Sequence, residues 1–212
     1  MSLDYEKQYY SEKVKFIAGC DEAGRGCLLG PVVAAAVILP QDYENDLIND
    51  SKQLTEKKRE KLFDEIVDHA IAWGVGVVPP EKIDEINILN ASKLAMEMAL
   101  ENMKHDYDYV LTDAVVLKNV KKPLEAIIKG DAKAQCIAAA SIIAKVTRDR
   151  MCIVMDKLYP QYNILKNKGY GTKDHLKALN EYGPVKGLHR FSYSPVKKSM
   201  ISKISLFEEN EK

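Results

Sequence analysis

Two adjacent acids, Asp21 and Glu22, are the residues best suited to chemistry in this chain. They follow an apolar run at residues 16–18 and precede a glycine-rich turn and a second apolar run, residues 32–39. This order predicts strand, loop and strand, with the acids at the end of the first strand. Buried acids are costly unless something pairs with them, and a divalent cation such as Mg²⁺ prefers carboxylate oxygens. For either acid alone, an ordinary charged hairpin tip is the alternative.

Two more acids, Asp113 and Asp131, also end short apolar runs, residues 109–112 and 124–128. If these runs are strands whose ends meet at one edge of a sheet, four carboxylates converge there. Four anions need a compensating charge, and two divalent ions about 3.5–4 Å apart would supply it. Such a centre suits phosphodiester hydrolysis, with Asp21 and Asp113 predicted to touch both ions. For Asp131 a helix N-cap is the alternative, because a long helical pattern follows it.

The turn after the first two acids carries an arginine between two glycines, Gly24-Arg25-Gly26. Glycine lets a backbone approach a ligand closely, so this turn can present backbone groups to a ribose 2′-hydroxyl, which distinguishes RNA from DNA. Arginine can meet a phosphate with its planar fork. Tyr170, between two glycines in a basic stretch, can stack on a sugar or a base. The alternative is a tyrosine packed in a turn.

Basic residues gather in the second half of the chain although the net charge is zero. From Lys118 to Lys198 there are 17 Lys and Arg residues against 6 Asp and Glu residues. The asymmetry predicts one face for a polyanion, unless it only separates two solvated surfaces. Four residues are predicted phosphate contacts: Ser51, Lys52, Lys145 and Arg148. For the last two, a solvated helix face is the alternative.

The order of these segments resembles that of the type 2 ribonucleases H, specifically bacterial ribonuclease HII, over residues 14–198. The likeness rests on these blocks: residues 19–39 (GCDEAGRGCLLGPVVAAAVIL), Asp50-Ser51-Lys52-Gln53-Leu54, Asp113, residues 129–150, Lys168-Gly169-Tyr170-Gly171-Thr172 and His189-Arg190. Two positions depart from the pattern. Ala114 stands where glycine is usual, and Phe191 stands where the pattern has a second arginine.

The resemblance implies an α/β protein with a ribonuclease H-like fold: a mixed central sheet flanked by helices, with a helical C-terminal segment. It implies an endonuclease that cleaves the RNA strand of RNA–DNA hybrids. The same enzyme would nick duplex DNA 5′ of a single embedded ribonucleotide, leaving 5′-phosphate and 3′-hydroxyl ends. Two Mg²⁺ or Mn²⁺ ions would be held by the four acids, Asp21, Glu22, Asp113 and Asp131. Tyr170 and the Gly24-Arg25-Gly26 turn would sense the junction between the ribonucleotide and the next deoxynucleotide.

Periodicity predicts the elements that must position these residues. Strands are expected at residues 14–19, 32–39, 72–78, 109–112 and 124–128. Helices are expected from Thr55 onward and at residues 81–86, 91–104, 132–158 and 173–182. The chain is expected to form one domain, with a catalytic core at about residues 14–160, a helical segment at 161–200 and a tail at 201–212.

Composition excludes several classes of protein. A chain of 212 residues with 46% apolar and 29% charged residues is typical of a globular protein with one core. It has no apolar run of the roughly 18 residues that a membrane span needs and no signal-peptide core, so a cytoplasmic monomer is expected. Four cysteines without CxxC spacing argue against a zinc or disulfide scaffold.

Three other functions and one partner complete the predictions. A run-specific type HIII ribonuclease would resemble a longer chain with an extra N-terminal domain, whereas about 13 residues precede the first strand here. A non-catalytic hybrid-binding protein would not need all four acids. A nucleotide-binding loop at Gly24, Gly26 and Gly30 would need a lysine and a following helix. Residues 201–207, ISKISLF, offer Leu206 and Phe207 as an anchor for a sliding clamp.

Overall fold

The computed structural model describes residues 5–48 and 54–200. The chain divides into two compact units, each made of separate segments. The first unit comprises residues 1–23, 33–77 and 92–147, and the second comprises residues 24–32, 78–91 and 148–212. The domain boundaries expected from the sequence stay a prediction. The units are described separately below.

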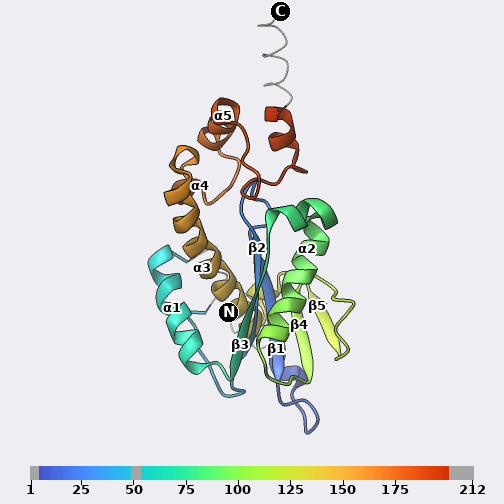
Figure 1. Cartoon of the computed structure of the whole chain (residues 1–212). Helices are drawn as coiled ribbons and strands as arrows, with labels where there is room; N and C mark the ends of the chain where they lie inside the picture. Colours follow the sequence, from blue (N-terminus) through green and yellow to red (C-terminus); the bar gives the residue numbers. More distant parts are fainter. Residues whose placement is uncertain (1–4, 49–53, 201–212) are drawn as a thin grey trace, which may run out of the picture. The chain divides into compact units, whose positions relative to one another are not determined.

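A five-stranded mixed sheet, in the order β3-β2-β1-β4-β5, is the centre of the first unit (Figure 1). Its strands are β1 (Ile17–Ala23), β2 (Val32–Ile38), β3 (Ala72–Val78), β4 (Tyr109–Asp113) and β5 (Leu124–Ile127). β1 is antiparallel to β2 and parallel to β4, and β4 is parallel to β5. The mixed α/β sheet predicted from the sequence is therefore confirmed.

The first strand lies later in the sequence than predicted. It was expected at residues 14–19, but it extends through Asp21 and Glu22 to Ala23. Asp21 pairs with Ala35 and Glu22 with Ala34 of β2. The acids therefore lie at the end of the first strand, as predicted, but the strand extends beyond residue 19 because backbone pairing to β2 continues through both acids.

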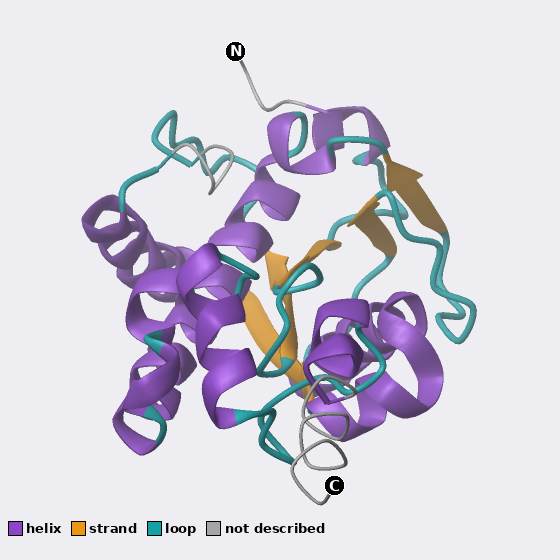
Figure 2. Ribbon diagram, turned by 90° about the horizontal axis from the view of Figure 1, so that it is seen from above, coloured by secondary structure: helices purple, strands orange, loops and turns teal. Residues whose placement is uncertain are grey.

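Helices cover both faces of this sheet (Figure 2). On one face, α1 (Glu56–His69) and the first half of α3 (Gln135–Leu158) pack on β2 through a core of small and branched residues, which includes Ala35, Val37, Leu62, Ile66, Ala139 and Ile143. On the other face, the last turns of α2 (Pro80–Asn102) lie against the backbone of β3. A Cβ atom added at Gly76 would stand 2.0 Å from the Ala95 carbonyl oxygen, so glycine is required for this approach.

Local hydrogen bonds explain where the helices begin. The Thr55 side chain accepts a bond from the Lys58 amide and caps α1, as predicted. The two helices expected at residues 81–86 and 91–104 form α2, interrupted at Asn87, which has a φ of 65°. The Asn87 side chain accepts a bond from the Asn90 amide at 3.1 Å and thereby starts the second piece.

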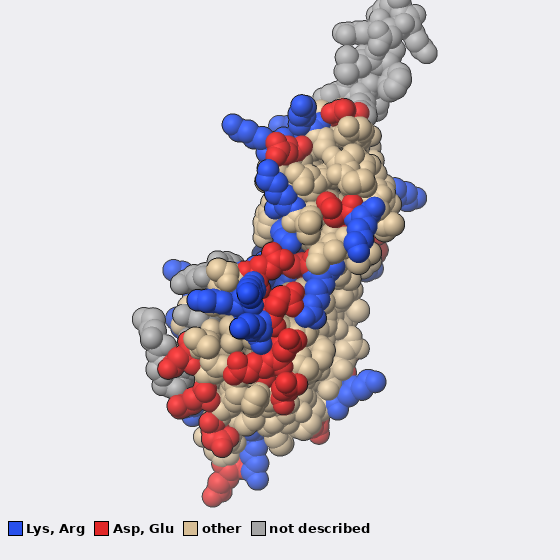
Figure 3. Space-filling model, turned by 90° about the vertical axis from the view of Figure 1, so that its left-hand side faces the viewer, with Lys and Arg blue, Asp and Glu red and all other residues tan. Residues whose placement is uncertain are grey.

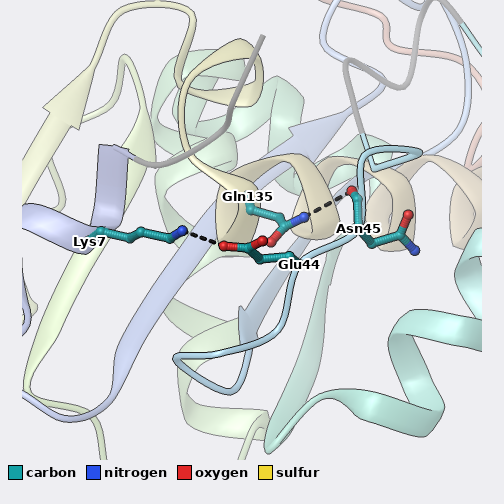
Figure 4. Close-up of polar contacts among 4 residues, drawn as sticks. All are labelled: Lys7, Glu44, Asn45 and Gln135. Atoms are coloured by element: carbon teal, nitrogen blue, oxygen red, sulfur yellow. Dashed lines mark hydrogen bonds and ion pairs between the residues drawn. The ribbon is translucent and has the colours of Figure 1, made fainter.

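Two segments of the first unit form hydrogen bonds with the start of α3. Glu6, in the 3₁₀ helix η1 (Tyr5–Tyr9), accepts hydrogen bonds from the amides of Gln135 and Cys136 at 2.9 and 3.0 Å. A carboxylate here satisfies exposed amides and faces the positive end of the helix. Figure 4 shows two flanking contacts, Lys7 to Glu44 at 2.6 Å and Gln135 to the Asn45 carbonyl at 2.9 Å.

The second unit contains η3 (Pro160–Tyr162), α4 (Ile164–Asn167) and α5 (Lys173–Tyr182). Its core gathers residues from several segments: Leu28, Leu29, Cys152, Tyr162, Leu179 and Val196. The glycine-containing loop at residues 24–31 is followed by β2. The nucleotide-binding alternative is therefore wrong, because a phosphate-binding loop of that kind needs a helix N-terminus.

Charges of both signs are interspersed on the face drawn in Figure 3. Two of the basic residues on which the predicted basic face rested, Arg148 and Arg190, are almost fully buried, and the face itself stays a prediction. Within residues 5–48 and 54–200, none of the helices has the length and hydropathy required to traverse a bilayer.

Candidate active site

Three of the four predicted acids come together in the first unit. Asp21 lies in β1, Asp113 ends β4, and Asp131 lies in the 3₁₀ helix η2 (Gly130–Ala132) that follows β5. Cys20 pairs with Thr112 across the parallel strands, so the next residues of both strands are neighbours. One ligand oxygen from each of the three acids lies within 4.8 Å of the other two. The predicted convergence at the strand ends is confirmed for this trio.

The surroundings of Asp21 strongly disfavour its charged form. Its side chain is only 4% exposed, and one oxygen accepts a hydrogen bond from the Glu22 amide at 2.7 Å. Burial, and then the charges of Glu22 and Asp113, raise the pKa of Asp21 well above its ordinary value, against the opposing effect of a hydrogen bond with Ser141. Three carboxylates in this setting need positive charge, and their oxygens are the donors that Mg²⁺ prefers.

Asp113 and Asp131 are linked through Gly130, the first residue of η2. The Gly130 amide donates to Asp113 Oδ1 at 2.8 Å, which fixes the orientation of that carboxylate. Asp131 is 5% exposed and stands four residues before Gln135, where α3 begins. The alternative role of Asp131 as the N-cap of the long helix is therefore wrong, since η2 intervenes.

Glu22 differs from the other three acids. It lies in the paired part of β1, opposite Ala34, and is half-buried. Glu22 is the next residue along the strand from Asp21, and its charge helps to raise the pKa of Asp21. It is not a member of the trio whose oxygens lie within 4.8 Å. Its role as a metal ligand stays a prediction.

Ala114, where the resemblance has glycine, adopts a left-handed backbone with a φ of 54°. Its amide donates to the Ile127 carbonyl at 3.0 Å, which closes the turn directly after Asp113. A left-handed conformation costs a residue with a Cβ atom about 1–2 kcal/mol. The departure at this position therefore leaves the turn intact, at a cost in stability.

Replacing Ala114 with glycine should stabilise the protein by about 0.5–1 kcal/mol, after the greater freedom of glycine in the unfolded chain is subtracted. The melting temperature should rise by about 1–4 °C. Ala114→Val is the matched control, and it should melt lower than the wild type because a β-branched residue is least tolerated at positive φ. Equal melting temperatures for all three proteins would contradict the strained turn.

The Gly24-Arg25-Gly26 turn belongs to the second unit and is held by buried side chains. Gly24 has a φ of 98°, and a Cβ atom added there would lie 2.1 Å from Arg148 Nε. The carbonyl of Arg25 accepts hydrogen bonds from Arg190 Nη1 at 3.0 Å and from the Tyr193 hydroxyl at 2.7 Å. The carbonyl of the turn is thus held by two side chains, whereas Arg25 and Gly26 are exposed.

Tyr170 lies beside this turn within the second unit. Its side chain is 47% exposed, and its Cε1 atom stands 3.6 Å from the position of a Cβ atom on Gly26. Burial of the remaining half, and then the neighbouring Cys27, raise the pKa of the Tyr170 hydroxyl. The structure therefore brings together the two elements for which the sequence predicted ribonucleotide recognition.

The predicted phosphate contacts have different outcomes. Arg148 is 1% exposed, and its guanidinium donates to the carbonyls of Pro31, Leu29 and Lys168 at 3.2, 3.2 and 2.8 Å. Because the Arg148 guanidinium donates its hydrogen bonds to loop carbonyls, this arrangement does not offer it to a phosphate. Lys145 is half-buried on α3 and stays a prediction. Ser51 and Lys52 lie outside the described residues.

Two residues that stabilise segments around this turn, Arg190 and Asp84, were not predicted from the sequence. Arg190 is completely buried, and its Nε donates to the Gly30 carbonyl at 3.0 Å. Asp84 accepts hydrogen bonds from the amides of Phe191 and Ser192, each at 2.8 Å. Since Phe191 takes part through its backbone, its side-chain departure from the family pattern leaves this contact in place. Only the His189-Arg190 block hinted at these roles.

Known proteins resemble this chain over almost its whole length. The sequence profile of the family described as Ribonuclease HII matches residues 18–196. The ribonuclease HII of Acetivibrio thermocellus is 55% identical over 190 residues, which cover 90% of this chain and 74% of that relative.

Two solved structures extend the comparison to the fold. The ribonuclease H2 of Pyrococcus horikoshii superposes with a TM-score of 0.73 at 30% identity, over 87% of this chain and 96% of that one. The RNase HII of Archaeoglobus fulgidus, solved as a complex with PCNA, gives a TM-score of 0.67 at 27% identity, over 82% and 92% of the two chains. The ribonuclease H-like fold is confirmed. The chain belongs to the ribonuclease HII family, the endonucleases that hydrolyse the RNA strand of RNA–DNA hybrids.

Proposed function

We propose that this enzyme also nicks duplex DNA on the 5′ side of a single embedded ribonucleotide, using two divalent ions. The convergence of Asp21, Asp113 and Asp131 within 4.8 Å is the observation that carries the proposal. Mg²⁺ or Mn²⁺ bound by these acids would activate a water for in-line attack and stabilise the leaving 3′ oxygen. The products would carry 5′-phosphate and 3′-hydroxyl ends.

The acids have separate tasks in this proposal. Asp21 and Asp113, adjacent across two parallel strands, would each offer oxygens to both ions. Asp131 and Glu22 would complete the ligand set. The bond from Gly130 to Asp113 would keep one carboxylate in a fixed orientation as the charge on the phosphate changes. A two-metal site of this kind needs no histidine as a base.

Specificity for the lone ribonucleotide would come from the second unit. The backbone of Gly24-Arg25-Gly26 would meet the 2′-hydroxyl, and the exposed half of the Tyr170 ring would stack on the sugar that follows. The contact between Gly26 and Tyr170 supports a joint role. Chain connectivity supports it as well, because Gly24 directly follows the strand that carries Asp21. Lys52, Ser51 and Lys145 would contact phosphates.

A labelled DNA duplex with one ribonucleotide, beside an RNA–DNA hybrid of the same sequence, tests the proposal. With Mg²⁺ or Mn²⁺ the wild type should nick 5′ of the ribonucleotide, and Asp113→Asn should abolish both reactions. Cleavage of the hybrid alone would show a run-dependent specificity and remove Tyr170 as a junction sensor. Tight binding without cleavage of either substrate would favour the non-catalytic alternative.

A sliding clamp is the proposed protein partner. The Archaeoglobus fulgidus RNase HII, 27% identical to this chain, was solved in complex with PCNA. The anchor predicted here, residues 201–207, lies outside the described residues. Truncation after Lys203 should abolish pull-down by the clamp, and absence of clamp binding by the intact protein would end this proposal. A cytoplasmic location and a monomeric state stay predictions.

A further inference from the structure

Two buried histidines of the second unit face each other below the Tyr170 loop. His175 in α5 and His189 are 0% and 1% exposed, and their Nε2 atoms are 3.4 Å apart. The ring of Tyr162 meets both edge-on, with centroids 4.7 Å from His189 and 6.2 Å from His175. Buried polar rings of this kind need every nitrogen satisfied.

The hydrogen bonds fix which nitrogen carries each proton. The Val185 amide, which can only donate, lies 3.0 Å from His189 Nδ1. A neutral His189 must therefore carry its proton on Nε2, where it points at His175 Nε2. His175 then has its proton on Nδ1, which donates to the Tyr170 carbonyl at 2.9 Å. We call this sequence, Val185–His189–His175–Tyr170, the histidine chain.

One protonation state alone satisfies all three bonds of the histidine chain. A second proton on His175 would place two donors between the rings, and a second proton on His189 would meet the Val185 amide. Burial, and then the neighbouring His175, lower the pKa of His189 to about 4, and burial lowers the pKa of His175. The charged residues that line the cavity beside His189 are Glu81, Asp84 and Lys186. At neutral pH both rings are therefore uncharged.

The histidine chain ends at the carbonyl of Tyr170, the residue for which ribonucleotide recognition is proposed. Tyr170 stands between Gly169, with a φ of 86°, and Gly171, so its own neighbours constrain it weakly. Its carbonyl accepts from His175 Nδ1 and from the Thr172 amide at 2.8 Å. The Thr172 side chain in turn caps α5 at the His175 amide. The loop is thus attached to the helix through His175.

We propose that His175 and His189 are positioning residues that hold Tyr170 in the orientation needed to select a lone ribonucleotide in DNA. This inference rests on the proposed function of Tyr170. Because the tautomers are fixed, Nδ1 of His175 always donates to the Tyr170 carbonyl, and this bond holds the Tyr170 loop in one position. Neither histidine touches the substrate, and both act through the carbonyl of Tyr170.

Two variants of His175 separate positioning from folding. Asparagine places its amide near the position of Nδ1 and retains the bond to Tyr170, whereas glutamine reaches toward His189 and loses that bond. Both disturb the buried pair and should lower the melting temperature. In His175→Gln, the ratio of kcat/KM for the lone ribonucleotide to that for the hybrid should fall about five- to tenfold, the value of one hydrogen bond. In His175→Asn the ratio should stay within about twofold.

The exposed His69→Gln variant is the control and should match the wild type in both reactions, because His69 lies in the last turn of α1, with Nδ1 2.8 Å from the Glu65 carbonyl and its ring beside Tyr43. Long-range ¹H–¹⁵N NMR should show a proton on Nδ1 of His175 and on Nε2 of His189, unchanged from pH 8 to pH 6. The reverse tautomers, or equal ratios for the two His175 variants, would overturn the inference. A wild type that does not nick the lone ribonucleotide refutes the proposed function itself, and the specificity role falls with it.

Discussion

The Asp21→Asn variant should lose cleavage of both substrates by more than about a hundredfold, yet melt higher than the wild type when metal is absent. The first effect follows because Asp21 would ligate both ions, and a ligand in that place contributes more than the outer residues whose loss costs 10–100-fold. The second effect follows from burial. Asp21 is 4% exposed beside two other acids, so its charge destabilises the metal-free fold.

The pH dependence of this destabilisation has a definite sign. The folded-state pKa of Asp21 is raised, by burial first and by Glu22 next. The unfolded chain therefore releases the proton at lower pH, near about 4. Above that pH the folded state holds more protons than the unfolded one, so stability falls as the pH rises toward the raised pKa. Asparagine cannot ionise, so the variant does not lose stability in this way. The difference in melting temperature between the variant and the wild type should therefore grow as the pH rises toward the raised pKa of Asp21, and then level off.

Melting curves in a chelator between pH 4 and pH 8 measure the difference. For a cost on the order of 1–2 kcal/mol, the variant should melt about 2–8 °C above the wild type at pH 8. Adding Mg²⁺ should raise the melting temperature of the wild type and leave the variant nearly unchanged. Asp68→Asn, at an exposed acid of α1, is the control and should follow the wild type throughout. A lower melting temperature for Asp21→Asn at every pH would show that the carboxylate stabilises the fold.

The ends of β4 and β5 could be predicted from the sequence, and so could the convergence of Asp21, Asp113 and Asp131. Apolar runs of fixed length set where β4 and β5 end, and parallel pairing then brings Asp113 beside Asp21. The start of α3 was three residues off, because it is set by Glu6, which lies more than a hundred residues away in sequence. No local pattern shows a cap of that kind.

The side chains that stabilise the Gly24-Arg25-Gly26 turn could not be predicted, for a different reason. Arg148 and Arg190 carry full charges, and sequence patterns place such residues at the surface. Their burial depends on several loop carbonyls that turn inward together, such as those of Leu29 and Gly30. The histidine pair likewise depends on two segments that meet only in the folded chain. Tertiary hydrogen bonds decided these positions.

The Gly19→Ala variant should be destabilised by about 3 kcal/mol or more, although it adds a single methyl group. A Cβ atom at Gly19 would lie 2.2 Å from the carbonyl carbon of Cys136, 2.5 Å from its oxygen and 2.5 Å from the Ile137 nitrogen. All three are backbone atoms, so no side chain can rotate away, and the strand and helix must separate. Overpacking of a rigid core costs 1–3 kcal/mol and occasionally more.

The same displacement should reach the active site. Gly19 stands two residues before Asp21 on β1, and Cys136 lies in the first turn of α3, shortly after Asp131. If β1 and α3 move apart, the trio of acids loses the spacing that brings its oxygens within 4.8 Å. Cleavage should therefore fall even at temperatures where the variant is fully folded, and the affinity for Mg²⁺ should fall with it.

Gly26→Ala is the matched control for the added methyl group. A Cβ atom there has Tyr170 Cε1 as its nearest neighbour at 3.6 Å, which is ordinary contact. Its melting temperature should stay within about 2 °C of the wild type, whereas Gly19→Ala should melt about 6–12 °C lower. If the turn contacts the ribose as proposed, Gly26→Ala should instead weaken nicking at the lone ribonucleotide, because its methyl group would lie between the turn and the substrate. If both variants melted like the wild type, close contact between β1 and α3 would not be what requires glycine at position 19.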